Sequence, residues 1–487
     1  MSKKTQSYTN RKHRKYIPER MPGNVAVKNK GGWLPGANGR TAKVEALLRG
    51  RKEETKEIAG NMAGYKDSGV EEVNFIPKDW NTLRMKDAFN ISKEIIGDKW
   101  TEAALLSLTT NGVKSITADE QVGKRPKTFA TYQRVTKNDI VMCLFDLDAS
   151  AVFSGLSGYD GMISPAYKIL KTKEQVLPEF ANYYFQYIFE GRKYKKYAKS
   201  IRYTLSGEEF LRLLIVLPPL HEQQRIADFL DTKCDILDRT IDAVSRQIEE
   251  LEKYKKALIT KTVTKGICKK GEPERAMKDS GVEWIGEVPE EWSVSKVKYN
   301  FSTFKKIPGK ESEKYERLSL TMNGVKHREK WTAEGLQPKD FMSYQLLRKG
   351  DLVFRLIDLQ NPSKSRRVAL SHDTGLISPA YTILHADNNK MLPEYAEMFF
   401  LMMSYLDVFN ALGSCGVRSS INNAELMKIS VLVPPLAEQQ QIADYLDEKC
   451  KNINNRVQKR RQQLEWLKKY KKSLIFDYVT GKKRVEK

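Results

Sequence analysis

The side chains whose type and spacing could do chemistry in this sequence are arginines and lysines, which bind phosphates and the edges of nucleic-acid bases. One pair, Arg202 and Arg418, is separated by 216 residues, a spacing that other segments share. Each arginine lies four residues before a capping-box pattern, Ser206-Gly-Glu-Glu209 and Asn422-Asn-Ala-Glu425. We therefore expect each arginine in a loop ahead of a helix N-terminus, where phosphate binds favourably. Pairing with a nearby carboxylate is the alternative.

Other basic side chains differ between the two halves of the chain. In the first half the further candidates for DNA contact are Lys124, Arg125, Lys127, Arg134, Arg192, Lys193, Lys195 and Lys196. In the second half they are Arg355, Lys364, Arg366 and Arg367. A run of charge is usually a solvated surface, so each of these residues alone is a hypothesis.

Catalytic and metal-binding patterns are missing from the sequence. It has no GxxxxGK[ST] loop, and its two Pro-Pro pairs follow Leu217 and Val433 instead of the Asn or Asp of an amino-methyltransferase. The five histidines show no ligand spacing, and the five cysteines form no CxxC. Asp146, Asp148 and Asp358 follow predicted strands, but no suitably placed lysine recurs in both halves, so turn or strand-end roles are expected. The sequence therefore predicts no catalytic site, no metal site and no cofactor of its own.

The overall charge suggests a polyanionic partner. The chain has 487 residues with 84 Lys and Arg against 61 Asp and Glu, a net charge of +23. No apolar run approaches the length of a membrane span, and the first residues lack a secretory signal, so a cytoplasmic protein is expected. Residues 1–61 are interpreted as a basic, mostly flexible extension that touches DNA phosphates or only aids solubility.

The chain is an internal duplication. Four segments return 212 to 216 residues later: Lys66–Val70 at Lys278–Val282, Leu106–Lys114 at Leu318–Lys326, Ile163–Tyr167 at Ile377–Tyr381, and Pro218–Leu220 at Pro434–Leu436. Between Pro219–Cys234 and Pro435–Cys450, twelve of sixteen positions are identical. Two copies of one fold tend to lie about a pseudo-two-fold axis.

Each copy is expected to combine a mixed α/β domain with one long helix. The stretches Asp139–Phe145 and Asp351–Ile357 read as strands. Leu177–Tyr197 and Leu392–Leu412 read as helices, and the long helices are expected over Pro219–Lys261 and Pro435–Asp477.

The two long helices carry apolar residues at the alternating steps of three and four that are typical of a coiled coil. The expected seam contains Leu230, Cys234, Leu237, Ile241, Val244, Ile248, Leu251, Leu258, Leu446, Cys450, Ile453, Val457, Leu464, Leu467 and Leu474. Both copies place a lysine at the same seam position, Lys255 and Lys471, and Arg460 alone breaks the apolar match between the two helices. The fold class is therefore mixed α/β, a tandem duplication whose helices pair as an antiparallel coiled coil, with the cysteines as core residues and not a disulfide. The alternative is that each helix packs on its own domain. About 42 residues at ~1.5 Å each would make a rod of roughly 60 Å that could act as a ruler.

The segments Leu217-Pro-Pro-Leu-His-Glu-Gln-Gln-Arg-Ile-Ala227 and Val433-Pro-Pro-Leu-Ala-Glu-Gln-Gln-Gln-Ile-Ala443 resemble the spacer helices of type I restriction–modification specificity subunits. The stretch Lys278-Asp-Ser-Gly-Val-Glu-Trp-Ile-Gly-Glu-Val-Pro289 resembles the opening of their recognition domains. The first copy, Glu71-Glu-Val-Asn-Phe-Ile-Pro77, and the extension 1–61 depart from the pattern.

This resemblance implies a noncatalytic subunit in which each recognition domain reads half of a split, asymmetric DNA site. It also implies partners: two methyltransferase subunits that dock on the helices, and motor–nuclease restriction subunits. S-adenosylmethionine, ATP and Mg would then belong to those partners. The expected divisions are an extension at 1–61, recognition domain 1 at 62–218, the central helix and linker at 219–277, recognition domain 2 at 278–434, and the C-terminal helix at 435–487.

Two other classes of protein remain open from the residues themselves. One is a self-sufficient DNA methyltransferase or nuclease, against which the missing motifs argue. The other is a coiled-coil scaffold whose basic charge is incidental. It predicts no sequence-dependent DNA binding when a methyltransferase is present.

Overall fold

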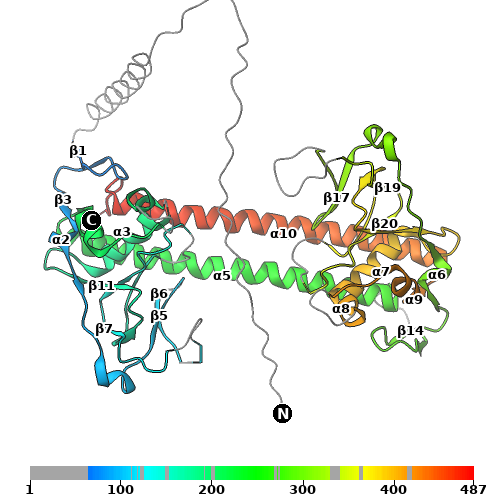
Figure 1. The fold of residues 1–487 in the computed structure, drawn as a ribbon, viewed down its shortest axis with the longest axis horizontal. Helices are drawn as coiled ribbons and strands as arrows, with labels where there is room; N and C mark the ends of the chain where they lie inside the picture. Colours follow the sequence, from blue (N-terminus) through cyan, green and yellow to red (C-terminus); the bar gives the residue numbers. More distant parts are fainter. Residues whose placement is uncertain are drawn as a thin grey trace, which may run out of the picture.

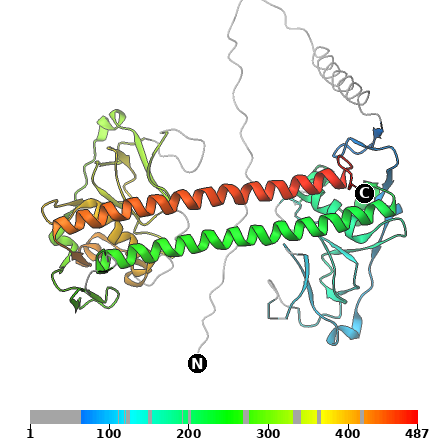
Figure 2. The same cartoon turned by 180° about the vertical axis from the view of Figure 1, so that it is seen from behind.

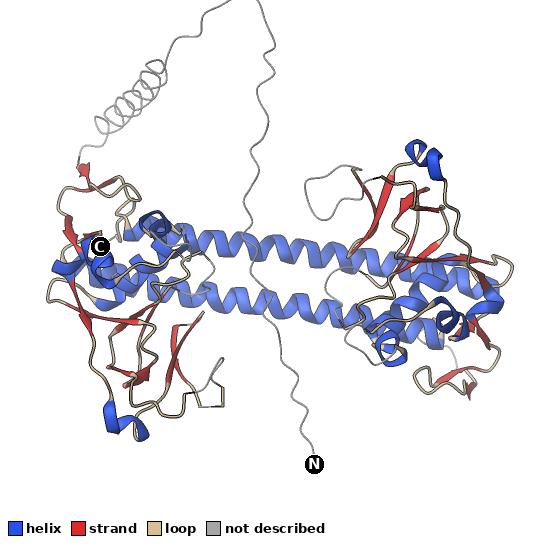
Figure 3. Cartoon of the chain, in the orientation of Figure 1, coloured by secondary structure: helices blue, strands red, loops and turns tan. Residues whose placement is uncertain are grey.

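Two globular regions lie at opposite ends of two long helices that run side by side (Figure 1). The computed structural model describes residues 64–486 except 111, 118, 121–125, 149–152, 191, 199–202, 268–270, 272–274, 330–339, 361–365 and 414–418. The expected extension at 1–61 therefore lies outside the described residues. Helices are concentrated in the rod and against its ends, and short strands form the outer parts of both regions (Figure 3).

The first globular region precedes the first long helix. Its elements are β1 (Tyr65–Asp67), β2 (Phe75–Pro77), β3 (Asn81–Arg84), α2 (Met85–Ala88), β4 (Phe89–Ser92), η1 (Gly97–Thr101), β5 (Leu106–Thr109), β6 (Gly112–Ser115), β7 (Gln133–Val135), β8 (Ile140–Met142), β9 (Ser154–Leu156), β10 (Gly161–Ile163), β11 (Lys168–Thr172), α3 (Pro178–Glu190), η2 (Lys193–Tyr197), α4 (Gly207–Arg212) and β12 (Leu214–Leu217). The long helix α5 (Leu220–Lys265) follows.

The second globular region repeats this order. Its elements are β13 (Met277–Asp279), β14 (Glu287–Pro289), β15 (Ser293–Lys296), α6 (Val297–Asn300), β16 (Phe301–Ser302), η3 (Gly309–Lys314), β17 (Arg317–Thr321), β18 (Gly324–Arg328), β19 (Gln345–Leu347), β20 (Leu352–Phe354), β21 (Val368–Leu370), β22 (Gly375–Ile377), β23 (Thr382–Ala386), α7 (Pro393–Tyr405), α8 (Val408–Leu412), α9 (Asn423–Lys428) and β24 (Ser430–Val433). The second long helix is α10 (Leu436–Val479).

The sheets confirm that the two regions are copies of one fold. An antiparallel four-stranded sheet has the order β4-β11-β8-β9 in the first region and β16-β23-β20-β21 in the second. A second sheet, β18-β17-β22-β19, includes one parallel pair. Its counterpart in the first region is two strand pairs joined by a bridge between Leu105 and Met162. The predicted strands at 139–145 and 351–357 appear as the shorter β8 and β20.

The two shorter helices predicted in each copy are interrupted. The stretch at 177–197 forms α3 and the 3-10 turn η2, with Arg192 in the left-handed conformation at φ 45° between them. The stretch at 392–412 forms α7 and α8, and Asp407 is left-handed at φ 55°. The prediction of single continuous helices was therefore wrong, because a left-handed residue cannot continue the helical hydrogen bonding.

The pairing of the long helices confirms the predicted antiparallel seam (Figure 2). Arg461 pairs with Glu252 at 2.6 Å, and Lys471 with Asp238 at 2.7 Å, so residue numbers rise along one helix as they fall along the other. Most predicted seam residues are buried, and Ile241, Leu251, Leu258 and Leu464 are partly buried against the same cores. Arg460 is exposed at its seam position, as a charged side chain requires.

The predicted seam cysteines are free, buried thiols. Burial raises the pKa of the Cys234 thiol to about 11, and it also raises the pKa of Cys450. Both residues are packed in apolar clusters, so they serve as small core side chains.

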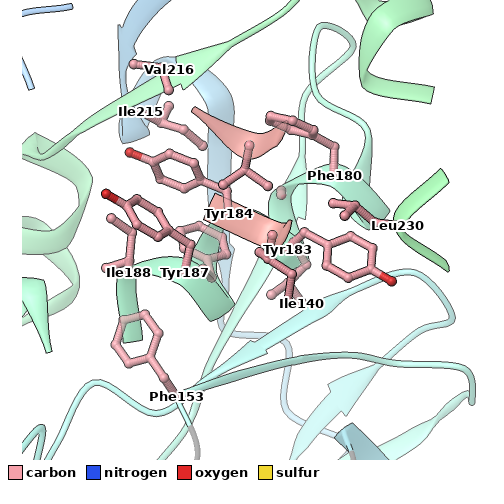
Figure 4. Close-up of a cluster of buried hydrophobic side chains, with 14 of the residues drawn as sticks. Ile140, Phe153, Phe180, Tyr183, Tyr184, Tyr187, Ile188, Ile215, Val216 and Leu230 are labelled. Carbon is pink, nitrogen blue, oxygen red and sulfur yellow. The ribbon is translucent and has the colours of Figure 1, made fainter. Parts of the chain in front are cut away.

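Each globular region folds against the start of one long helix and the end of the other. The first core contains Leu230 of α5 together with Ile475 and Val479 of α10. The second core contains Leu446 of α10 together with Ile259 and Val263 of α5. In the first core, Phe180 and Tyr184 of α3 lie with Leu230 and the β12 side chains (Figure 4). Full burial of such side chains contributes about 1.5–3 kcal/mol each, so the rod and the regions stabilise one another.

Candidate nucleic-acid interface

Five of the predicted DNA contacts lie outside the described residues. They are Arg202, Arg418, Lys124, Arg125 and Lys364. The capping boxes that follow the two arginines are confirmed: the Ser206 hydroxyl accepts a hydrogen bond from the Glu209 N–H at 3.1 Å, and Asn422 accepts one from Glu425 at 3.0 Å. The two arginines therefore precede α4 and α9 as expected, and their role stays a prediction.

The basic cluster around η2 is held by carboxylates from elsewhere in the first region. Lys195 pairs with Asp148 at 2.6 Å, and this hydrogen bond raises the pKa of Lys195. Lys196 pairs with Glu71 and with Glu72, the latter at 2.8 Å. To bind DNA phosphates, these lysines would have to exchange one anion for another.

Of the four remaining described candidates of the first region, Arg192, Lys193 and Arg134 also have partners. Arg192 donates to the Leu147 carbonyl at 2.8 Å, and Lys193 lies 4.7 Å from the centre of the Tyr187 ring. Arg134 pairs with Glu94 at 3.0 Å on the surface, where such a pair contributes less than about 1 kcal/mol. Lys127 is exposed. The surface pair and the exposed lysine are the ones that DNA could engage at least cost.

In the second region two of the predicted contacts are buried. Arg367 donates to the carbonyls of Ile357, Asp358 and Leu359 at 3.2, 3.0 and 2.6 Å, and burial lowers its pKa. Arg355 pairs with Asp358 at 3.2 Å. Both arginines therefore stabilise the turn after β20, and their role as direct DNA contacts stays a prediction, which their burial disfavours.

Asp146 and Asp358 take the turn role that the sequence predicted. Both are left-handed, with φ of 49° and 55°, and they follow the equivalent strands β8 and β20. Aspartate tolerates this conformation better than most residues. Arg366 pairs with the nearly buried Glu397 of α7 at 3.1 Å, so it too has a role inside the region.

The repeated Glu-Gln-Gln of the long helices connects each helix to its globular region. The side-chain oxygen of Gln223 accepts from the Leu177 N–H at 2.8 Å, and its amide donates to the Gln175 and Pro218 carbonyls at 2.9 Å. Gln439 makes the same three bonds in the second copy, at 2.8 to 2.9 Å. Both side chains are fully buried, so the motif has a structural role that sequence reasoning did not assign.

The two long sides of the rod differ in charge. One side of α5 carries acidic residues at steps of three and four, interrupted once at Ser245: Asp228, Asp231, Asp235, Asp238, Asp242, Glu249 and Glu252. Arg461 of α10 meets Glu252 on this side. We call it the acidic side.

The opposite side of the rod carries large exposed apolar residues. Ile236 and Tyr254 of α5 are 54% and 58% exposed, and Trp466 and Tyr470 of α10 are 61% and 46% exposed. Their heptad positions place all four on the flank away from the acidic side. The Trp466 and Tyr470 rings stack at 5.3 Å. We call this the aromatic side. The bases Lys233, Lys449, Arg456 and Lys459 share its heptad positions, and between residues 230–258 and 446–474 the one acid at these positions is Glu250.

Within the described part of the chain, no helix is long and apolar enough to cross a membrane. No group of three or more His, Cys, Asp or Glu side chains in that part is arranged to hold a metal ion.

Comparison with known proteins identifies the family. The model of the type I restriction modification DNA specificity domain matches residues 77–253 and 380–465, more than half of the chain. The type I restriction enzyme MjaVIII specificity subunit of Methanocaldococcus jannaschii is 25% identical over 455 residues, which cover 87% of this chain and 98% of that protein. The putative type I restriction enzyme MjaX specificity subunit of the same organism is 25% identical over 449 residues, with the same shares.

A solved structure shows the same fold. A chain from work on complex assembly and conformational transition of the type I R-M system aligns with a TM-score of 0.57 at 12% identity, over 83% of this chain and 98% of that one. The duplication, the paired helices and the family match agree along most of the sequence. The chain therefore belongs to the family of type I restriction modification DNA specificity domains.

Proposed function

We propose that this chain is the noncatalytic subunit that gives a type I restriction–modification complex its DNA sequence specificity, and that each globular region reads one half of a split, asymmetric site. The observation that carries this proposal is the presence of two copies of one fold at opposite ends of an antiparallel pair of helices. The copies share their scaffold but differ in their basic candidate residues, as readers of unlike half-sites should. The relatives named as specificity subunits favour this function over an independent enzyme or a scaffold.

The rod would set the gap between the half-sites. The 46 residues of α5 give a length of roughly 70 Å, close to two turns of B-form DNA. Recognition domains at 62–218 and 278–434 would then meet the same face of the duplex. Many phosphate contacts from a chain with a net charge of +23 would make binding strongly dependent on salt.

The aromatic side of the rod would dock the two methyltransferase subunits. Exposed Trp and Tyr side chains are typical of the residues that dominate protein interfaces. Their surroundings are basic, so the complementary surface of the methyltransferase would carry apolar residues flanked by Asp and Glu. Restriction subunits would join this assembly in the cytoplasm. S-adenosylmethionine, ATP and Mg would be held by the partner subunits.

Single-molecule sequencing of modified DNA tests the recognition role. Cells would express this chain with its methyltransferase, once as the natural chain and once with residues 62–218 exchanged for those of a relative. The natural chain should produce a motif of two half-sites separated by a fixed gap, and the exchange should change one half only. A continuous motif, or a change in both halves, would contradict the proposal.

Co-purification with the methyltransferase tests the docking role. Trp466→Ala combined with Tyr470→Ala should weaken the complex about tenfold or more, because large exposed aromatic rings carry a disproportionate share of interface energy. Asp242→Ala, on the acidic side, is the matched control and should leave the affinity unchanged. Equal affinity of the double variant and the natural chain would exclude the aromatic side as the docking surface.

A further inference from the structure

The segment that follows α10 contacts the first globular region, whereas α10 itself begins at the second globular region. The Tyr65 hydroxyl donates to the Gly481 carbonyl at 2.9 Å, and the Lys482 ammonium donates to the Phe75 carbonyl at 2.9 Å. Thr480 is fully buried. The end of α10 is thereby attached to the β1–β2 hairpin, more than 400 residues away in sequence.

Three distant parts of the chain meet at one carboxylate beside this segment. The Glu222 side chain at the start of α5 accepts a hydrogen bond from the indole N–H of the fully buried Trp80 at 3.1 Å. Arg484 lies 3.3 Å from the same carboxylate and 2.5 Å from Asp79. We call Trp80, Glu222 and Arg484 the first junction. It joins the first region, the start of α5 and the end of α10.

The other end of the rod has an equivalent second junction, formed by Trp292, Glu438 and Arg275. The Trp292 indole N–H donates to Glu438 at 2.8 Å. Arg275, from the segment after α5, makes two bonds to the same carboxylate at 2.5 and 2.8 Å, and it also pairs with Glu291. A two-bond contact between arginine and carboxylate fixes orientation as well as distance.

A glycine lies against each junction where the opposite helix ends. Gly481 has φ of 70°, and an added Cβ atom would lie 2.5 Å from the Pro77 ring. Gly266 has φ of 76°, and an added Cβ atom would lie 2.7 Å from Arg275 and 2.9 Å from Glu438. The positive φ favours glycine at both positions, and at Gly481 the close approach to the rigid Pro77 ring also requires it. The same arrangement at both ends indicates a shared role.

We propose that Arg484 and Arg275 are positioning residues that hold each recognition domain at one place on the rod and so restrict the DNA site to one gap length. This inference rests on the proposed function. Each domain packs on both helices through apolar side chains, and because such contacts are not directional they leave small rotations of the domain on the rod possible. Arg484, from the segment after α10, pairs with Asp79 of the first region and with Glu222 at the start of α5. Arg275, two residues before β13, pairs with Glu291 of the second region and with Glu438 at the start of α10. Each arginine therefore adds a directional contact between a domain and the start of the helix that follows it, which opposes such rotation.

Methylation of duplexes with different gaps tests the proposal. The complex of the full chain with its methyltransferase would be given DNA with both half-sites fixed and the gap shortened or lengthened by one base pair. Arg484→Ala should raise the ratio of off-gap to native-gap methylation about tenfold, and Arg484→Lys should recover part of the restriction. Lys483→Ala is the matched control because Lys483 pairs with Asp477 of its own segment, at 2.8 Å. It should leave the ratio unchanged.

A second, milder variant keeps the test valid if Arg484→Ala does not fold. Asp79→Asn removes only the outer partner of Arg484 and should raise the same ratio by a smaller factor. Variants that methylate the native gap normally but keep the natural off-gap ratio would overturn the inference. A natural complex that shows no preference among gaps would instead overturn the proposed function, so the two failures are distinguishable.

Discussion

At the scale of single residues, the most informative side chains are the buried polar ones at the starts of the long helices. Gln223 and Gln439 each bond one backbone N–H and one carbonyl of the turn before α3 or α7, and one carbonyl of the proline pair before their own long helix. Neighbouring Gln224 and Gln440 instead bond Asp228 and Asp444 on the exposed surface. The two adjacent glutamines of each long helix thus contribute differently to the stability of the protein, and only the fold distinguishes them.

Replacing the buried glutamine should destabilise the protein. Gln223→Ala leaves the Leu177 N–H and two carbonyls without partners, so we expect the free energy of unfolding to fall by about 1–3 kcal/mol. Gln224→Ala should change it by less than about 0.5 kcal/mol. Chemical denaturation of both variants measures the difference. Equal stabilities would show that water replaces the lost bonds.

The pairing of Asp79 with Arg484 should make the first junction sensitive to acid. The hydrogen bond from Arg484 lowers the pKa of Asp79, so the stabilisation is present above the ordinary carboxyl pKa near 4 and is lost as the pH falls through the lower folded value. The melting temperatures of the natural chain and Asp79→Asn should therefore differ at pH 6 and converge towards pH 3. A difference that stays constant over this range would contradict the role of the ion pair.

At the scale of elements, the seam between α5 and α10 is the main structural unit. Its polar positions are also paired: Lys255 donates to Asn454 at 2.8 Å and Lys471 to Asp238 at 2.7 Å, at opposite ends of the overlap. Burial lowers the pKa of Lys255. A sliding of one helix along the other would leave these lysines without partners, so they favour one register.

Variants at two adjacent residues of α5 allow the effect on folding stability to be measured separately from the effect on methyltransferase docking. Leu237 is buried in the seam, so Leu237→Ala should lower the free energy of unfolding by about 2–4 kcal/mol through loss of burial and creation of a cavity. Ile236 is 54% exposed on the aromatic side, so Ile236→Ala should leave stability nearly unchanged and weaken methyltransferase binding. Denaturation and co-purification measure the two effects. An equally large loss of stability in both variants would contradict the assigned seam.

The sequence predicted the duplication, the long helices, the seam and both capping boxes. The duplication is visible as repeated segments, and the other features depend on the spacing of residues that are close in sequence. The sequence did not predict the breaks at Arg192 and Asp407, where the apolar pattern continues while the backbone turns. It also could not separate exposed from paired lysines, because the partners of Lys196, Glu71 and Glu72, lie about 125 residues away in sequence. The sequence contained a signal for the two junctions, because Trp80 and Glu222 of the first copy recur as Trp292 and Glu438 in the second. The arginines that complete the junctions are not at equivalent positions in the two copies, so this comparison does not reveal them.

At the scale of the whole molecule, the core of each recognition domain includes residues of both long helices, so the two domains and the helix pair form one structural unit. The first core includes the end of α10 and the second includes the end of α5. The distance between the domains is therefore a property of the helix pair and not of a flexible linker. Lengthening one helix alone would disturb the register, whereas lengthening both equally would move the domains apart.

The most direct test of this account is to insert one matched heptad into the middle of α5 and of α10 and to sequence the DNA methylated in cells. Seven residues at ~1.5 Å each lengthen the rod by roughly 10 Å, which corresponds to at most about three base pairs of B-form DNA. We predict that both half-site sequences stay the same and that the gap between them becomes longer. Methylation of the original site with its original gap would contradict the central claim that the paired helices set the spacing.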